Sequence, residues 1–322
     1  SISSSGNNDL NETNVLKTKI INDINYTGFD IINNYGLKNN ISLYFKNLNA
    51  VGKNASKLKN SPQIELMSIL KADSSLPLKK KGPKYLNYLT PKLSLLINPS
   101  DMKNHSETER KINNENIFDI NRLGLTDSLE TGKSLTLGLD YKRERLEDIN
   151  KYFEFKLATV FRDKEETFIP STSTLNKKTS NLFGSLSNNF SDNLSLKYDF
   201  ALDNNFNEFE YNELISKISL NNLVTEFSFI EERGAIGSTS ILENNSKYIF
   251  DENNSISFKT RRNRKINLTE YYDLVYEYQN DCLTAGIKYN KTYYEDRDLK
   301  PTENLLFTIT LFPLTSYEQK IN

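Results

Sequence analysis

The chain has 322 residues, a formal net charge of −1 and 37% hydrophobic residues, with a mean hydropathy of −0.61. The balanced charge argues against a nucleic-acid binder. A helical membrane protein is excluded, because no run approaches the roughly 18 apolar residues of a membrane-spanning helix. A membrane β-barrel is not excluded, because only alternate residues of its strands need be apolar. The 18 Tyr and 18 Phe residues suit β-strands and the aromatic girdles of such barrels.

The chain begins with a polar stretch that is followed by alternating segments. Residues 1–16 read SISSSGNNDLNETNVL, and we predict from this composition that they are disordered. Side chains alternate between the two faces of a strand, and this period is clear where Ile41, Leu43 and Phe45 share one face. The polar segment 99–130 is too long for a hairpin connection, which predicts a functional or surface loop. Before this loop we predict strands at about 17–29, 40–49, 62–72 and 85–98.

The alternation becomes stronger after residue 130. In the run 151–162, Phe153 and Phe155 share a face opposite to Glu154 and Lys156. A strand with apolar Leu135, Leu137, Leu139 and Tyr141 precedes it, and a second long loop, 163–179, follows it. Further strands are predicted at about 180–190, 193–203, 208–220, 222–231, 237–250, 253–261, 269–279, 282–294 and 302–313. The total is roughly fifteen strands, with boundaries good to a few residues.

Two features of these strands favour a membrane barrel. Many runs have about ten residues or more, which is longer than a usual soluble strand and about the length that crosses a bilayer when tilted. Tight turns such as 191–193 and 221–222 alternate with longer connections, as in bacterial barrels with short periplasmic turns and longer outer loops. On this parity Cys282 and the Lys79–Lys81 run are periplasmic. The predicted fold is therefore all-β, an antiparallel transmembrane β-barrel. A soluble antiparallel sandwich, which alternates in the same way, stays open as the alternative.

The alternating faces also predict the surroundings of individual side chains. Charges in the middle of the polar faces indicate a water-filled lumen. The side chains expected to face lipid are Leu135, Phe155, Leu196, Phe227 and Leu274, and those expected to face the lumen are Lys156, Lys197 and Glu226.

Two segments carry a resemblance to a known family. The stretch 121–141, NRLGLTDSLETGKSLTLGLDY, resembles a segment of the lipopolysaccharide-assembly outer-membrane proteins, the LptD family. The stretch 276–311, YEYQNDCLTAGIKYNKTYYEDRDLKPTENLLFTITL, resembles the C-terminal strands of the same family, with a cysteine opening the penultimate one. The resemblance implies a very large barrel with a separate N-terminal periplasmic domain and a plug lipoprotein in its lumen. Such a protein receives lipopolysaccharide from periplasmic bridge proteins and releases it sideways between its first and last strands.

The sequence departs from this family in one major respect. It has no counterpart of the periplasmic domain and too few strands, so we expect it to be the C-terminal part of a longer protein. Residues 17–313 are then a barrel portion and residues 314–322 a C-terminal tail. The resemblance makes strand 302–313 the closing strand of the lateral gate, and Cys282 the partner of a cysteine in the missing N-terminal region. The gate residues are Leu305, Phe307, Thr308, Ile309, Thr310 and Leu311.

The sequence contains no recognisable catalytic constellation. His105 is the only histidine, which excludes a histidine-based triad and a His-rich metal site. We therefore predict no enzymatic activity and no cofactor. The basic cluster of Arg261, Arg262, Arg264 and Lys265 can contact lipopolysaccharide phosphates, because guanidinium groups bind phosphate bidentately. Its simpler interpretation is a solvated outer loop.

The functional prediction follows from the resemblance and the pattern together. We expect a component of an outer-membrane translocon that inserts lipopolysaccharide into the outer leaflet through a lateral gate. Its expected partners are lipopolysaccharide, a plug lipoprotein, periplasmic bridge proteins and membrane lipid, with no nucleic acid. Two alternatives remain: a passive porin or ligand-gated uptake barrel, and a secreted β-sandwich adhesin or carbohydrate-binding module.

Overall fold

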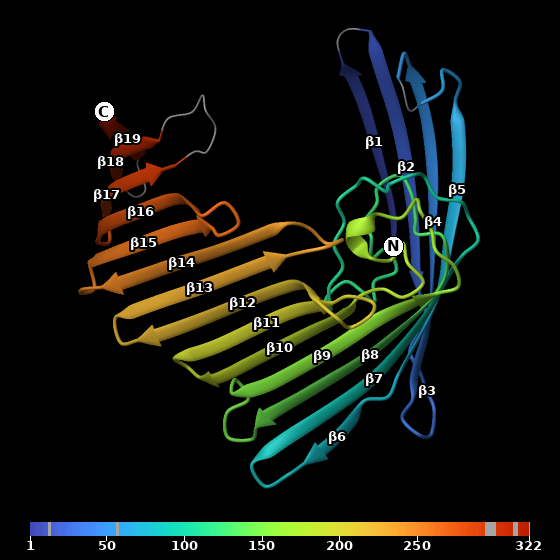
Figure 1. Ribbon diagram of the computed structural model, residues 1–322, viewed down its shortest axis with the longest axis horizontal. Coiled ribbons are helices and arrows are strands. Elements are labelled where there is room, and N and C mark those ends of the chain that lie inside the picture. The colour runs from blue at the N-terminus through green and yellow to red at the C-terminus, as the bar shows by residue number, and fades with distance from the viewer. Residues whose placement is uncertain (12–13, 56–57, 294–300, 312–314, 322) are drawn as a thin grey trace. The chain divides into compact units, whose positions relative to one another are not determined.

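The computed structural model describes residues 1–11, 14–55, 58–293, 301–311 and 315–321, the last range by its backbone alone. These residues form an all-β chain with 19 strands in one sheet (Figure 1). One short 3₁₀ helix, η1 (Ser171–Ser173), lies in a connection. Among the described residues no helix is long and apolar enough to cross a membrane.

The strands differ widely in length, from 2 residues in β3 to 16 in β4 (Lys38–Lys53). Two are very short, β3 (Ile31–Ile32) and β6 (Leu78–Lys81), and most of the others have ten residues or more. The remaining strands are β1 (Ile2–Asn11), β2 (Val15–Thr27), β4 (Lys38–Lys53), β5 (Gln63–Ser75), β7 (Tyr85–Asn98), β8 (Gly132–Arg145), β9 (Tyr152–Arg162), β10 (Leu182–Ser191), β11 (Leu194–Leu202), β12 (Phe209–Leu220), β13 (Leu223–Glu232), β14 (Thr239–Ile249), β15 (Asn254–Asn263), β16 (Leu268–Gln279), β17 (Leu283–Thr292), β18 (Thr302–Leu311) and β19 (Thr315–Ile321).

The chain divides into two compact units. Unit 1 contains residues 1–142, 155–184 and 201–208, and unit 2 contains residues 143–154, 185–200 and 209–322. In unit 1 the antiparallel order runs from β1 to β2, β4, β5 and β7. In unit 2 each strand from β12 to β19 pairs antiparallel with the next one along the chain. Such up-and-down pairing is the connectivity of membrane barrels.

The tight turns are built by asparagine. Asn221 has a φ of 46°, a left-handed conformation that Asn tolerates better than most residues, and it joins β12 to β13. Between β16 and β17 the Oδ1 atom of Asn280 accepts hydrogen bonds from the backbone N–H groups of Cys282 (3.0 Å) and Leu283 (2.8 Å). This side-chain-to-backbone bonding closes the turn without further residues, and the predicted tight turns are thus confirmed.

The sheet has an apolar face and a polar face in each unit. In unit 2 the apolar face carries Phe227 (45% exposed) and Leu274 (41% exposed). Glu226, on the other face of β13, lies opposite Lys217 of β12. Exposed aliphatic and aromatic side chains in this number are unusual for a soluble surface and suit a surface that meets lipid. The large exposed side chains of the apolar face in unit 1 include Ile41, Phe45, Leu70, Leu93, Leu95 and Leu137.

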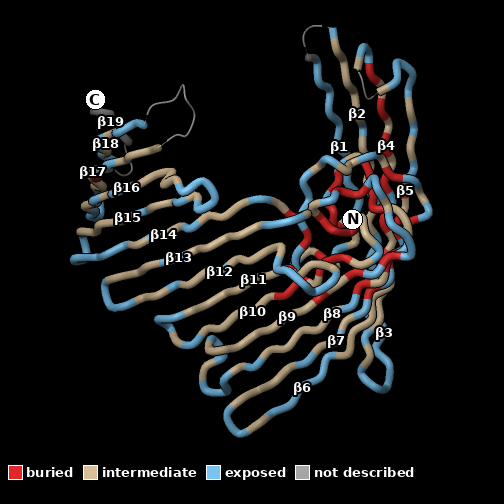
Figure 2. The backbone as a smooth tube through the Cα atoms, viewed as in Figure 1, coloured by how far each residue is buried: buried red, intermediate tan, exposed pale blue. Residues whose placement is uncertain are grey.

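Part of the polar face of unit 1 is covered by other segments of the chain rather than open to solvent. Leu48, Ile69 and Leu96 are at most 2% exposed and belong to one core cluster with Leu129, from the connection between β7 and β8. The buried residues are concentrated where these connections lie (Figure 2). Part of the nominally polar face is therefore apolar, because it packs against chain rather than against water.

Two terminal predictions are wrong. Residues 1–16 were expected to be disordered, but β1 pairs with β2 from Ile2–Ile24 to Asn11–Val15. Polar side chains support this pairing, with Ser4 Oγ donating to Asn22 Oδ1 (2.7 Å) and Thr18 Oγ1 donating to Asn8 Oδ1 (2.9 Å). Residues 314–322 were expected to be a tail, but Thr315–Ile321 forms β19, which pairs with β18. Backbone hydrogen bonds hold both strands, so neither needs an apolar alternation.

Candidate functional site

Two long connections form a folded layer on the polar face of unit 1. We call residues 99–131 and 163–181 the loop layer. Leu123, Leu129, Ile169 and Leu175 of this layer are at most 2% exposed. The two connections also bond to each other, as when the His105 N–H donates to the Phe168 carbonyl oxygen (2.9 Å). The long loops predicted from the sequence are confirmed, but they are packed chain rather than surface loops.

A buried charge cluster ties the loop layer to the sheet. Glu130 lies in the loop layer just before β8, and its carboxylate accepts hydrogen bonds from Arg122 Nε (2.7 Å) and Nη2 (2.6 Å). Arg162, at the end of β9, donates to the same carboxylate. Arg122 also donates to Ser134 Oγ (2.8 Å) and Thr136 Oγ1 (2.9 Å) of β8. All three charged residues are at most 6% exposed. Removing any one of them would leave a buried charge without its partner, at a large cost in stability.

The electrostatics of this cluster follow from its two cations. Burial by itself would raise the pKa of Glu130, but the charge and hydrogen bonds of Arg122, and then those of Arg162, outweigh it. The pKa of Glu130 is therefore held below its ordinary value of 4.5. A carboxyl group with a depressed pKa in the folded state stabilises that state at neutral pH.

We expect acidification to release the loop layer. The stabilisation from Glu130 is fully present above its ordinary pKa of 4.5 and is lost as the pH falls from there towards the lower pKa of the folded state. Proteolysis of the loop layer, followed against pH, should accelerate over this range. The variant Glu130→Gln has no carboxyl group to protonate, so its proteolysis should lack this step. An equal step in both proteins would contradict the prediction.

A second clamp joins the loop layer to β2 and β4. Lys46, which is 3% exposed, donates from Nζ to the Thr126 carbonyl oxygen (3.0 Å) and pairs with Asp23 (2.8 Å). Asp127 pairs with Lys19 (3.0 Å) and lies 3.1 Å from Nε2 of His105. His105 therefore makes a contact inside the loop layer, with Asp127. Among the described residues no group of three or more potential ligands is arranged to hold a metal ion.

Arg122, Glu130 and Arg162 are not among the functional residues predicted from the sequence. The first two lie inside the quoted segment 121–141, and Arg162 ends the predicted strand 151–162. One signal was available, because Arg162 has the parity of Glu154 and Lys156 and thus the polar face of β9. Its pairing with Glu130, 32 positions away, depends on the packing of the loop layer, which no local pattern reveals.

The predicted basic cluster is divided between the two faces of unit 2. Arg261 lies on the polar face and pairs with Glu270 (2.7 Å) and Glu243 (3.3 Å). Arg262 is opposite Leu242 of β14 and donates to Asn267. The Arg264 guanidinium lies 5.4 Å from the centre of the Phe229 ring, which places this cation beside the apolar face.

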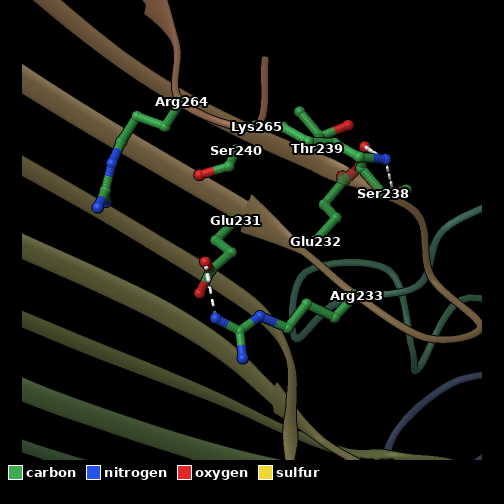
Figure 3. Close-up of a pocket in the computed structure, with 8 residues that line it drawn as sticks. All are labelled: Glu231, Glu232, Arg233, Ser238, Thr239, Ser240, Arg264 and Lys265. Atoms are coloured by element: carbon green, nitrogen blue, oxygen red, sulfur yellow. Dashed lines mark hydrogen bonds and ion pairs between the residues drawn. The ribbon is translucent and has the colours of Figure 1, made fainter. Parts of the chain in front are cut away.

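Arg264 and Lys265 also line a polar cavity of about 380 Å³ (Figure 3). The end of β13 contributes Glu231 and Glu232, and the start of β14 contributes hydroxyl groups. Lys265 Nζ donates to the hydroxyl and the carbonyl group of Ser238. The cavity thus combines basic groups at the end of the apolar face with two nearby carboxylates.

Cys282 lies exposed in the tight turn between β16 and β17, as a free thiol. It is the only cysteine of the chain, so no disulfide forms within these residues. Pairing with a cysteine outside them stays a prediction.

We expect non-reducing electrophoresis of the full-length protein to reveal that pairing. An exported cysteine in an oxidising compartment normally forms a disulfide, so the unreduced protein should migrate differently from the reduced one. The Cys282→Ser variant should lose the difference. An unshifted wild-type band, together with complete alkylation of Cys282, would rule the disulfide out.

The predicted gate residues lie in β18. Leu305, Phe307, Ile309 and Leu311 share the apolar face and are 38–45% exposed, and Thr308 and Thr310 lie between them. The prediction that this strand closes the sheet is wrong, because β18 pairs with β17 on one edge and with β19 on the other. Thr308 faces Glu318 across the second edge.

Several solved structures have a related arrangement of strands. They include the ferric enterobactin receptor PfeA of Pseudomonas aeruginosa in complex with enterobactin (10% identity, TM-score 0.43) and the siderophore receptor PirA of Acinetobacter baumannii (8% identity, TM-score 0.43). The copper transporter OprC is another (9% identity, TM-score 0.36). The matches cover 95%, 95% and 97% of this chain and 57%, 58% and 58% of those chains. Similarity at this level assigns neither a ligand nor an activity.

The family comparison is specific. No curated protein matches the chain significantly, but the family model described as LptD, LPS transport system D, matches residues 25–230. This match covers more than half of the 322 residues and includes the strands of unit 1 from β3 onwards, the loop layer and the buried charge cluster. The chain therefore belongs to the LptD family, a family of non-enzymatic transport barrels of the bacterial outer membrane.

Proposed function

We propose that this chain is the part of an outer-membrane translocon that inserts lipopolysaccharide into the outer leaflet. The family match over residues 25–230 carries the proposal. The two-faced sheet supports it, because lipopolysaccharide has a sugar part and an acyl part. A polar face can accommodate the sugars, and the apolar face meets the acyl chains of the bilayer.

The lateral exit is proposed to open beside β18. Among the described residues β18 pairs with β19 from Leu305–Ile321 to Leu311–Thr315, and the apolar side chains of β18 flank this edge. Every backbone group unpaired in lipid costs several kcal/mol, so an exit at this edge requires that these backbone hydrogen bonds open and reform during export.

Disulfide tethers can test this exit in the full-length protein. Cysteines at Thr308 and Glu318 would tether β18 to β19 at a register pair, and they should block lipopolysaccharide export until a reductant is added. Cysteines at Lys288 and Leu306 tether β17 to β18 at another register pair and should leave export intact. Export that continues with the first tether fully formed would refute this exit.

The basic residues near the apolar face are proposed to contact lipopolysaccharide phosphates. Arg264 and Lys265 are the best placed, since the Phe229 ring beneath Arg264 belongs to the apolar face. Arg262 adds a third cation, and the ion pairs of Arg261 with Glu243 and Glu270 make it a structural member of the cluster. On the turn parity this cluster lies on the outer side of the membrane, where the phosphates of the outer leaflet lie.

A plug lipoprotein and periplasmic bridge proteins complete the proposed assembly. The polar face of unit 2 carries a charged ladder that suits a protein partner. Asp273 pairs with Lys288 (3.0 Å), and Arg261 pairs with two glutamates. These side chains are only partly exposed and are held by their neighbours, so a plug that packs here would meet an ordered polar surface.

A further inference from the structure

A second cavity lies on the polar face of unit 1, beneath the tip of the loop layer. It measures about 430 Å³, within the roughly 300–1,000 Å³ of typical small-molecule sites. Three neighbouring strands form its walls, and their lining residues are in register, with Asn40 opposite Asp73 and Ser42 opposite Lys71. Phe118 and Asp119 of the loop layer close it on the other side. All of these groups belong to unit 1.

The charges of the cavity wall are paired internally. Lys71 Nζ contacts Asp73 (2.6 Å) and Lys38 Nζ contacts Asp30 (2.8 Å). Neither lysine is therefore available as the main ligand of a phosphate, because a neighbouring carboxylate already neutralises it. Asp119 adds a third carboxylate, which is exposed and has no side-chain partner among the residues that the structure describes.

The remaining polar groups make the wall rich in hydrogen-bond acceptors. Ser42 Oγ donates to Asn40 Oδ1 (3.2 Å), and Asn40 Nδ2 donates to the Gly28 carbonyl oxygen (2.6 Å) and to Asp30 (3.3 Å). Ionised carboxylates accept only, and each has more lone pairs than these contacts use. A ligand that fits such a wall must offer many donors without carrying a dominant charge, and this is the chemistry of sugar hydroxyl groups.

An aromatic ring gives the cavity an apolar side. The half-buried ring of Phe118 lies against Gly138 of β8, where an added Cβ atom would be only 2.5 Å from Cζ of Phe118. Lys92 Nζ lies 5.5 Å from the centre of the same ring. Gly138 therefore makes room for Phe118, and the ring is held in place as a wall. A sugar ring has an apolar C–H face in addition to its hydroxyl groups, and pockets with an aromatic wall and a few placed polar groups suit such ligands.

We propose that this cavity binds a saccharide, namely the sugar part of lipopolysaccharide, on its way past the loop layer. The proposal rests on the proposed transport function. It adds a recognition site for hydroxyl groups that is separate from the basic cluster of unit 2, and it assigns Asp119 as a hydrogen-bond acceptor and Phe118 as a packing surface.

Binding of a lipid-free oligosaccharide, released from lipopolysaccharide by mild acid, tests this site in the full-length protein in detergent. Titration calorimetry should show about tenfold weaker binding for Asp119→Ala, the loss expected when one hydrogen bond to a charged group is removed. The matched control is Asp101→Ala, another exposed aspartate of the loop layer that does not line the cavity, and it should bind like the wild type.

A glycine pair tests the aromatic wall independently. Gly138→Ala displaces Phe118 and should also weaken the oligosaccharide complex, whereas Gly6→Ala, with no atom within 4 Å of the added carbon, should not. The saccharide site would be refuted if Asp119→Ala bound the oligosaccharide as tightly as the wild type, or if inorganic phosphate competed with the oligosaccharide. Lipopolysaccharide export would continue in either case, because the transport function does not depend on this result. Loss of the transport function itself would instead appear as a wild-type protein that neither exports lipopolysaccharide nor associates with it.

Discussion

Replacing Glu130 by alanine should destabilise unit 1 by about 3–5 kcal/mol, the usual consequence of removing one partner from a buried ion pair. The substitution leaves Arg122 and Arg162 facing each other with their charges uncompensated, and both are at most 6% exposed. Because Glu130 joins the loop layer to β9, the loop layer should be the first part to unfold and detach from the sheet. Limited proteolysis between residues 99 and 131 and the temperature of heat-induced unfolding in detergent should both report this loss.

Two comparisons separate charge from shape in this experiment. Glu107→Ala changes an exposed glutamate of the same loop segment, so its effect should stay within about 0.5 kcal/mol. The triple variant Glu130→Leu, Arg122→Met, Arg162→Met removes all three charges and should regain part of the lost stability, because apolar replacement of a whole buried cluster is often tolerated. A triple variant less stable than Glu130→Ala would show that the charges themselves are not the cause.

The alternation of side chains explains why most strands could be predicted from the sequence. Strand 85–98 agrees with β7 at both ends, and strand 269–279 differs from β16 by one residue. These strands have a continuous apolar face, and their turns carry Asn, Asp and Gly, so pattern and turn chemistry agree. In β1 and β19 the pattern is absent, and the pairing depends on a neighbouring strand that no local window contains.

The loop layer could not be predicted for a related reason. Its buried side chains, such as Met102, Ile112, Ile117, Leu123 and Leu125, are spaced irregularly in a segment that is polar on average. Irregular chain has no period to detect, and its burial is decided by the surface on which it lies. The same packing brings Glu130 to Arg162, so the buried cluster and the two cavities could not be predicted from the sequence. The position of Arg162 on the polar face of β9 could be predicted, because it follows from the alternation of side chains.

Polar side chains also occur on the apolar face of unit 2, where they form hydrogen bonds with one another. In the half of the β13–β14 pair that begins at Leu223, Thr225 Oγ1 and Ser246 Oγ are 2.7 Å apart, and Asn244 donates to Thr225 (3.1 Å) and accepts from Ser246 (3.0 Å). These three residues share the face of Phe227 and Leu242. A closed set of hydrogen bonds leaves few groups to solvate, so the cost of this polar patch in lipid is small. A single charge without such partners should behave differently.

Leu274→Arg should therefore impair folding far more than a charge exchange on the opposite face. Leu274 lies near the middle of β16, is 41% exposed, and has Phe258 and Tyr289 as its register partners, so an arginine there meets lipid and apolar side chains. A charged residue at the bilayer midplane of a barrel costs about 2–4 kcal/mol.

Glu277→Leu is the matched substitution on the polar face of the same strand, and it removes a charge from a surface in contact with water. We expect refolding into detergent or lipid vesicles, followed by heat-modifiable electrophoresis, to be strongly reduced for Leu274→Arg and nearly normal for Glu277→Leu. The same contrast is expected between Leu196→Arg and Lys197→Leu on β11, where Lys197 pairs with Asp199 (3.0 Å) on the polar face. Equal tolerance within both pairs would mean that the apolar face does not meet lipid, because only the low dielectric of the bilayer makes one face so much less tolerant of charge than the other.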